Sequence, residues 1–177
     1  MARQLWLLRH AEAEPHGTRP DAERRLTPRG EQQARAAGVA IQGLAVAFDE
    51  VLFSPKVRAR ATAELAAEGW SAQQRELLHE HPPLASGFDA HQAIDVLTGV
   101  PAQEGRLLLV GHEPDLSLTV AGLTGGRIDL KKGGLAVVRL EGGTPRLDDD
   151  GVVGELAVLM RPRELAGIAG LLPINRD

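Results

Sequence analysis

The stretch Leu5-Trp6-Leu7-Leu8-Arg9-His10-Ala11 decides the fold class, because a continuous apolar run ends in an arginine and a histidine. An apolar run without alternation is typical of a strand buried on both faces, as in a parallel sheet covered by helices. Ligands of such α/β sheets bind just beyond the carboxyl ends of the strands. Arginine offers a fixed fork of donors, and histidine can act as nucleophile, acid or base. Arg9 and His10 therefore indicate a phosphate site; the alternative is an ordinary strand end whose two side chains reach solvent.

A second apolar run ends in the same way, in Leu107-Leu108-Leu109-Val110-Gly111-His112. If both runs are adjacent central parallel strands, His10 and His112 emerge at one edge of the sheet within a few ångströms of each other. Between the two runs, Phe53-Ser54-Pro55 ends another strand and precedes a helix with Arg58 in its first turns. We therefore expect Arg58 to bring further positive charge to the same edge.

Four motifs stand in this order along the chain: Leu7-Leu8-Arg9-His10-Ala11, Arg24-Arg25-Leu26-Thr27-Pro28-Arg29-Gly30, Ser54-Pro55 with Arg58 and Thr62, and Leu109-Val110-Gly111-His112 with Pro114. Each motif is weak alone, but four in register are specific. Together they resemble the histidine phosphatase superfamily, and within it the small SixA-type phosphohistidine phosphatases. The resemblance implies a three-layer α/β/α sandwich with a mainly parallel central sheet and a phosphoglycerate mutase-like fold.

The size and composition of the chain agree with this class. Its 177 residues predict one domain over residues 1–177. The net charge of −4 argues against a general binder of nucleic acids or anionic membranes. There is no cysteine, which excludes disulfides and thiolate chemistry. No apolar stretch approaches the roughly 20 residues of a membrane span, and the N-terminus lacks the pattern of a signal peptide. The default expectation is a cytoplasmic protein, with the oligomeric state left open.

Hydrophobic periodicity and turn residues predict the remaining elements. The predicted strands are 4–8, 51–53, 76–79, 106–110, 135–140 and 152–160, and the predicted helices are 28–42, 58–68, 90–97, 115–123 and 161–172. The last two strands are expected to form an edge hairpin, with Asp148-Asp149-Asp150 as solvated turn residues rather than a metal cluster. The polar loop 12–26 is long for a compact domain, and such loops are often functional.

Phosphoryl transfer needs an in-line nucleophile and positive donors around the equatorial oxygens. His10 suits the first role, because a neutral imidazole can attack phosphorus and split hydrolysis into transfer and attack of water. Arg9 and Arg58 suit the second. The resemblance adds Arg24 as a further phosphate contact and a donor role for His112 on the opposite side of the phosphoryl group. The family usually has proline at position 25, so that Arg25 stays an alternative to Arg24.

The general acid is where this chain departs from the family. Phosphomonoesterases of the superfamily usually carry a carboxylate that protonates the leaving alkoxide. The segment 82–87 resembles the matching family region, yet it has Pro83 where an acid could align. Glu80 is the nearest upstream candidate and Glu12 is the other, although Glu80 could equally be a solvent-facing strand residue. A missing acid would suit a phosphohistidine substrate, since the leaving imidazole can depart neutral.

Three functions are weighed. The first is a phosphatase acting on a phosphorylated histidine-containing protein. The second is a phosphomonoesterase for small phosphorylated substrates, for which a larger inserted cap is expected. The third is a non-catalytic phosphoprotein-binding module, which the retention of both histidines and at least two arginines disfavours. No metal or other cofactor is expected, because His79 and His81 alternate along one strand face without a further ligand cluster.

Overall fold

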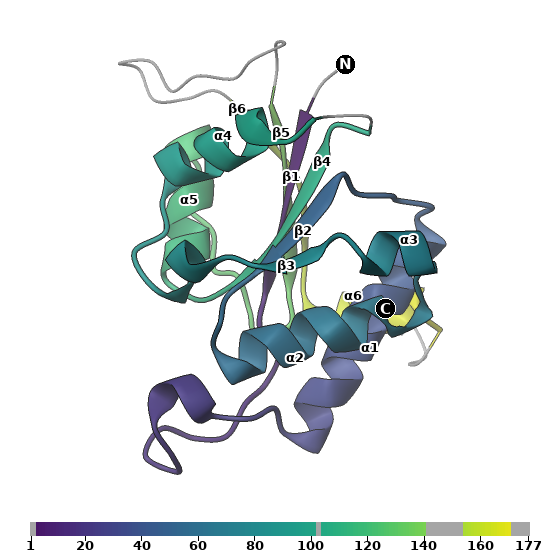
Figure 1. The fold of residues 1–177 in the computed structure, drawn as a ribbon, viewed down its shortest axis with the longest axis vertical. Coiled ribbons are helices and arrows are strands. Elements are labelled where there is room, and N and C mark those ends of the chain that lie inside the picture. The colour runs from purple at the N-terminus through teal and green to yellow at the C-terminus, as the bar shows by residue number, and fades with distance from the viewer. Residues whose placement is uncertain (1–2, 102–103, 141–153, 171–177) are drawn as a thin grey trace, which may run out of the picture.

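A computed structural model describes residues 3–101, 104–140 and 154–170 (Figure 1). The strands are β1 (Arg3–Arg9), β2 (Glu50–Phe53), β3 (Leu78–Glu80), β4 (Arg106–Gly111), β5 (Leu135–Leu140) and β6 (Gly154–Met160). The helices are α1 (Pro28–Gly43), α2 (Val57–Ala66), α3 (Ala72–Arg75), α4 (Ala90–Gly99), α5 (Asp115–Thr124) and α6 (Pro162–Ile168). Three 3₁₀ turns join them: η1 (Asp21–Glu23), η2 (Ala67–Gly69) and η3 (Pro82–Ala85).

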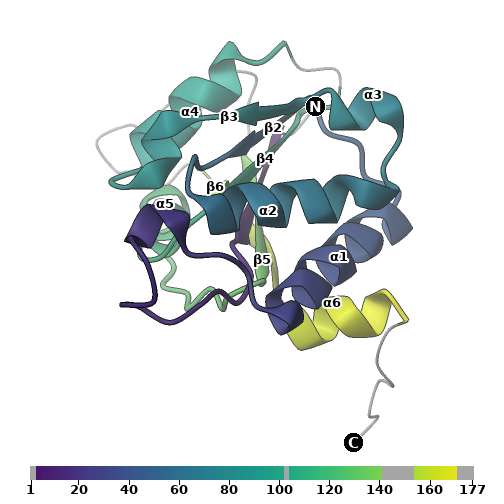
Figure 2. The same cartoon turned by 60° about the horizontal axis from the view of Figure 1, so that its bottom comes forward.

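The described strands form one sheet in the order β3-β2-β4-β1-β5-β6. β3, β2, β4 and β1 are parallel, whereas β5 and β6 are antiparallel to their neighbours and form the far edge. Helices α4 and α5 cover one face of the sheet, and α1, α2 and α6 cover the other (Figures 1 and 2). This architecture confirms the three-layer α/β/α class with a mainly parallel sheet.

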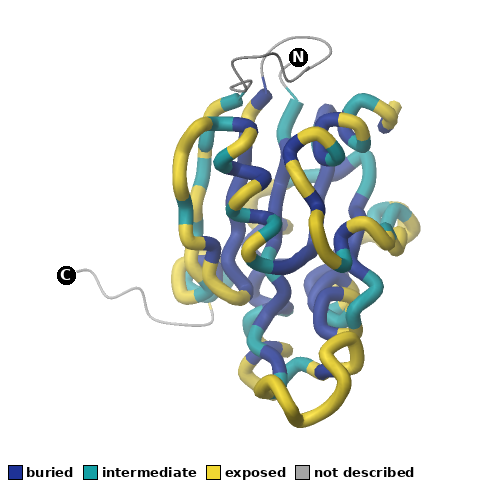
Figure 3. The backbone as a smooth tube through the Cα atoms, turned by 90° about the vertical axis from the view of Figure 1, so that its left-hand side faces the viewer, coloured by how far each residue is buried: buried dark blue, intermediate teal, exposed yellow. Residues whose placement is uncertain are grey.

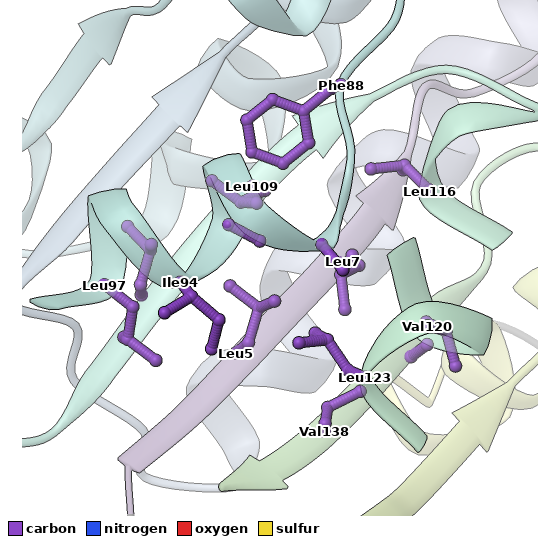
Figure 4. Packing of buried hydrophobic residues seen from close by; sticks show 14 of the residues in the cluster. Leu5, Leu7, Phe88, Ile94, Leu97, Leu109, Leu116, Val120, Leu123 and Val138 are labelled. Carbon is purple, nitrogen blue, oxygen red and sulfur yellow. The ribbon is translucent and has the colours of Figure 1, made fainter. Parts of the chain in front are cut away.

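Alternation along the central strands builds a core on each face of the sheet, since successive side chains of a strand point to opposite faces. Leu5 and Leu7 of β1 pack with Leu109 of β4 against α4 and α5 (Figure 4). Trp6 and Leu8 pack on the other face, against α1, α2 and α6. The central strands are buried along their length, as Figure 3 shows. This burial explains why their sequences are continuous apolar runs.

Helices α1 and α2 cross at very short range on the second face. A Cβ atom added at Gly38 of α1 would lie 1.9 Å from the carbonyl oxygen of Ala66 in α2. The first turn of α1 makes a similar approach, since a Cβ at Gly30 would lie 1.9 Å from the carbonyl oxygen of Glu12. Thr27 is the N-cap of α1: its hydroxyl oxygen accepts a hydrogen bond from the Gly30 N–H at 3.0 Å. Because glycine has no side chain at these two contacts, α1 can pack directly against α2 and against the loop that follows β1.

Some element boundaries differ from the sequence-based expectations. Helix α3 was not predicted; Ser71 caps it by accepting from the Gln74 N–H at 3.2 Å. Glu76 still donates to Ala72 O at 3.1 Å, so that β3 begins at Leu78 and not at residue 76. Helix α2 ends at Ala66 because η2 continues the chain in a tighter turn.

Parts of the predicted C-terminal elements lie outside the described residues. These are positions 152–153 of the last strand, positions 171–172 of the last helix, and the triad Asp148-Asp149-Asp150. Within the described ranges β6 follows the prediction, whereas α6 ends at Ile168, before the predicted end of that helix. No helix in those ranges is long and apolar enough to cross a membrane.

Candidate active site

Two histidines meet at the carboxyl ends of β1 and β4. The strands are parallel neighbours with Arg9 paired to Gly111, so that His10 and His112 follow at the same level. Their ring centroids are 5.1 Å apart, with the planes inclined by 54°. Both are buried. The sheet register thus brings together two side chains that lie about a hundred positions apart in the chain.

The contacts of His10 fix its tautomer. Its Nδ1 lies 2.8 Å from the carbonyl oxygen of Ala11, and because a carbonyl only accepts, Nδ1 carries the proton. Nε2 then holds the lone pair and accepts a hydrogen bond from Arg58 Nε at 3.3 Å. Burial lowers the pKa of His10 to about 3, and the charges of His112, Arg58 and Arg9 act in the same direction. His10 is therefore a neutral imidazole whose Nε2 is unprotonated at ordinary pH.

His112 has a different surrounding. Its Nε2 lies 2.7 Å from the hydroxyl oxygen of Ser54, the residue that follows β2. Its Nδ1 is buried, and the described chain offers it no hydrogen-bond partner. Burial lowers the pKa of His112 to about 3, with further lowering by the charges of Arg58 and Lys56. A neutral His112 with the Ser54 bond on one nitrogen presents its other nitrogen as donor or acceptor.

Three cations converge on one carboxylate beside the histidines. Asp21 of η1 accepts from Arg24 at 2.9 Å, from Arg58 at 3.2 Å and from Lys56 at 3.1 Å. Arg58 also donates to the backbone oxygen of Asp21 at 2.6 Å. Burial raises the pKa of Asp21, but the hydrogen bonds of Lys56 and Arg24 and the charge of Arg58 outweigh it and hold that pKa well below its usual range. Figures 1 and 2 show η1 next to the start of α2, where this cluster lies.

The loop η1 distinguishes the two candidate arginines. Arg24 is buried, donates to both Asp21 and the carbonyl of Glu14, and lies in the cation cluster. Arg25 is exposed, and its backbone N–H bonds the Glu14 carboxylate instead. Arg24 therefore faces the histidine site.

Arg9 directly precedes His10 at the end of β1, and its charge is one of those that lower the pKa of His10. Its Nη1 donates to the carbonyl oxygen of Leu130 at 2.9 Å, and its Nε is buried without a partner in the described ranges. Burial lowers the pKa of Arg9, while the charges of Glu113 and Asp129 oppose this. The structure thus groups Arg9, Arg24 and Arg58 around the two histidines.

The carboxylates proposed as general acids are turned elsewhere. Glu80 forms an exposed ion pair with Arg60, on the strand β3. Two strands separate β3 from β1, which is about 14 Å at the usual strand spacing. Glu12 accepts from Thr27 at 2.9 Å and lies 3.4 Å from Arg29, at the start of α1. Neither is brought into contact with the histidines.

Sequence reasoning gave no role to several residues that shape the site. Asp21 anchors the arginines, Ser54 bonds His112, and Thr62 links the Ala11 N–H at 3.1 Å to the carbonyl of Arg58 at 2.7 Å. Ser54 and Thr62 stand inside the quoted motif, which was a usable signal. Glu113 was also passed over; burial raises its pKa, and it lies directly after His112. No group of three or more His, Asp or Glu suited to a metal occurs in the ranges that the structure covers.

Comparison with known proteins identifies the class. The model of the histidine phosphatase superfamily (branch 1) matches residues 5–82. An uncharacterized protein of Picosynechococcus sp. is 30% identical over 172 residues, which cover 92% of this chain and 98% of that protein. This chain belongs to the histidine phosphatase superfamily and is of the SixA type. The chain is a phosphatase of this class.

Solved structures agree on the fold. A candidate phosphohistidine phosphatase SixA from Nakamurella multipartitia is 28% identical with a TM-score of 0.74, over 92% of this chain and 97% of that one. The protein histidine phosphatase SixA complexed with tungstate has a TM-score of 0.71 at 24% identity, over 92% and 99%. A candidate α-ribazole-5'-P phosphatase from Escherichia coli has a TM-score of 0.66 at 22% identity, over 92% of this chain and 98% of that one. Because the last two structures are less than 25% identical to this chain, their likeness to it concerns the fold alone.

Proposed function

We propose that this phosphatase hydrolyses phosphohistidine in proteins through a covalent phosphohistidine on His10. The observation that carries the proposal is the state of His10: Nδ1 donates to Ala11, and the unprotonated Nε2 lies among arginines. In the first step the Nε2 lone pair forms a bond to phosphorus while the bond from phosphorus to the leaving nitrogen breaks. In the second step a water oxygen bonds phosphorus and the phosphorus–Nε2 bond breaks, which returns the lone pair to His10.

The cations are proposed to hold the phosphoryl oxygens. The Arg58 Nε–H, which now bonds His10 Nε2, turns to an oxygen when Nε2 attacks. Arg9 and Arg24 supply further charge, and His112 supplies a donor. The Nδ1–H bond to Ala11 O strengthens as His10 gains positive charge in the phosphoenzyme, so that it favours the intermediate.

The substrate class follows from the leaving group. Glu80 pairs with Arg60, and Glu12 bonds Thr27 and lies near Arg29, which argues against either carboxylate as the donor to a leaving group that departs opposite Nε2. A phosphohistidine protonated on its other ring nitrogen leaves as neutral imidazole and needs no such donor, whereas an alkoxide does. A small-molecule phosphomonoesterase is the second candidate, supported by the shared fold of the α-ribazole-5'-P phosphatase.

The test uses the full chain and three substrates: a phosphohistidine peptide, phosphoramidate and a panel of sugar phosphates. We expect hydrolysis of the first two, and a ³²P-labelled phosphoenzyme that is acid-labile. His10→Ala should lose both turnover and the labelled enzyme, because it removes the imidazole nitrogen that accepts from Arg58 Nε and carries the phosphoryl group. Turnover retained by His10→Ala would exclude His10 as the nucleophile, and sugar phosphates cleaved as fast as phosphohistidine would favour the second candidate.

A further inference from the structure

A groove of about 820 Å³ lies between α1 and α6, which run alongside each other (Figure 2). Four cationic side chains line this α1–α6 groove: Arg29, Lys131, Arg161 and Arg163. Among the residues that the structure describes, the lining includes no carboxylate, and Ala36 and Ala166 supply small apolar surface. The phosphatase mechanism proposed above uses none of these residues.

Hydrogen bonds connect the walls of the groove to residues 9–12, the segment that contains His10. Gln33, which lines the groove, accepts from the Glu12 N–H at 2.9 Å. On the other side, the turn that carries Lys131 also holds Gly133, whose N–H donates to Arg9 O and His10 O at 3.1 Å each. Thus the wall of the groove is the outer side of the segment that positions His10. The groove and the His10 site thus share this segment as a common wall.

The charge of the groove is available to a ligand. Carboxylates outside the lining pair with three of the cations: Glu12 with Arg29 at 3.4 Å, Glu164 with Arg163 at 3.8 Å, and Asp129 with Lys131. The side chains of Arg29 and Arg163 are about three-quarters exposed, at 74% and 75%. Such exposed pairs contribute little and exchange readily for other carboxylates. Arg161 has no ion-pair partner in the described ranges.

We propose that the α1–α6 groove binds an acidic segment of the phosphorylated protein substrate, flanking the residue whose phosphoryl group enters the His10 site. The inference rests on the proposed function in that the substrate is a protein. Small side chains such as Ala36 and Ala166 leave room for an extended backbone, and the cations match Asp and Glu side chains. The described part of the lining has no aromatic side chain on which nucleic-acid bases could stack. The protein as a whole carries a net charge of −4, so that this positive region is local.

A binding measurement tests the groove without turnover. A fluorescent, unphosphorylated peptide containing a run of glutamates is titrated with the full chain, beside the same peptide with glutamines. We expect about tenfold tighter binding of the glutamate peptide, the sum of a few exposed ion pairs. The double variant Arg161→Gln/Arg163→Gln should lose this preference. Arg75→Gln/Arg139→Gln removes the same charge from exposed positions outside the groove and should keep it.

A turnover measurement then tests whether the groove contributes to substrate binding during catalysis. Phosphohistidine peptides with glutamate or glutamine flanks are compared with phosphoramidate, which is too small to reach the groove. We expect the acidic flank to lower KM about tenfold in the parent protein and in the control variant but not in Arg161→Gln/Arg163→Gln, with phosphoramidate hydrolysis unchanged throughout.

The outcomes separate the two proposals. Equal binding of both peptides, or binding unaffected by Arg161→Gln/Arg163→Gln, overturns the groove proposal even if phosphohistidine is hydrolysed. Displacement of the glutamate peptide by a single-stranded oligonucleotide at lower concentration than by unlabelled peptide also overturns it, in favour of nucleic acid. Groove-dependent peptide binding without hydrolysis of any phosphohistidine substrate keeps the groove as an acidic-peptide site and refutes the proposed function instead.

Discussion

Arg58 connects the nucleophile to the anion-binding side chains. It contacts His10 Nε2 through Nε, and Asp21 through both Nη atoms, while being buried. A guanidinium so held is oriented before substrate arrives, which is what electrostatic stabilisation of a transition state requires. Its contribution should therefore appear in the chemical step.

Arg58→Ala should lower kcat/KM for phosphoramidate. The loss should correspond to about 3 kcal/mol of transition-state stabilisation, by analogy with the loss of one preorganised donor. Arg60→Ala, two positions further along α2, removes an exposed arginine and should change kcat/KM less than about threefold. Steady-state kinetics on both variants, with circular dichroism to confirm folding, make the measurement. Equal effects of the two substitutions would contradict a specific role for Arg58.

Glu80 is expected to be dispensable, because its carboxylate pairs with Arg60 on the edge strand β3. Glu80→Gln should leave phosphoramidate hydrolysis unchanged, and the parent protein should cleave activated aryl phosphates about 10²-fold or more faster than sugar phosphates, the usual contribution of general acid catalysis. Glu113→Gln is the companion variant, because burial raises the pKa of Glu113. If Glu80→Gln removes a substantial sugar-phosphatase activity, Glu80 is a working acid.

At the scale of elements, the crossing of α1 and α2 fixes where Arg58 stands relative to β1. The approach of Gly38 to the Ala66 carbonyl leaves no room for a side chain. Because the obstructing atom is backbone, a larger residue must push the helices apart rather than rotate a neighbour.

Gly38→Ala should therefore lower the free energy of unfolding by roughly 2–3 kcal/mol, despite the higher helix propensity of alanine. Gly43→Ala is a matched control at the last residue of the same helix, where an added Cβ meets no atom within 4 Å. That variant should be neutral or slightly stabilised. Urea denaturation of the three proteins measures the difference, and equal stability of the two variants would refute the close crossing.

At the scale of the whole molecule, burying two neutral histidines links folding to pH. His10 and His112 have pKa values of about 3 in the folded protein, against 6.5 for an ordinary histidine. Between these values both are neutral when folded and protonated when unfolded. Unfolding therefore takes up protons in this window, and stability must fall as the pH falls through it.

As the pH falls from roughly 5.5 to 4.5, the free energy of unfolding should decrease by about 1.4 kcal/mol for each histidine, or about 2.7 kcal/mol for the pair. His112→Asn should lose about half of this slope. Urea denaturation at several pH values measures it, and NMR of the imidazole protons of His10 should show no titration between pH 5 and 8. A titration of His10 near pH 6.5 would show that it is not held neutral.

Hydrophobic patterning in the sequence was enough to predict the central strands of the sheet and the residues at which they end. Continuous apolar runs are possible only for strands covered on both faces, so that residues 4–8 and 106–110 could be read as central parallel strands. Since parallel strands end at the same edge, the pattern predicted that His10 and His112 lie close together if the two strands are adjacent, and the structure confirms both points. The short helix α3 was not predicted, because four residues carry too little periodicity to distinguish a helical turn from a loop.

The tertiary structure alone decided which polar groups of the loops meet at that edge. The choice between Arg24 and Arg25, the anchoring role of Asp21 and the outward pairing of Glu80 depend on how η1 and β3 pack beside α2. The groove between α1 and α6 likewise joins residues from three distant segments. Local sequence encodes hydrophobic period and turns, whereas these contacts arise from packing between elements, and their directions exist only once the chain has folded.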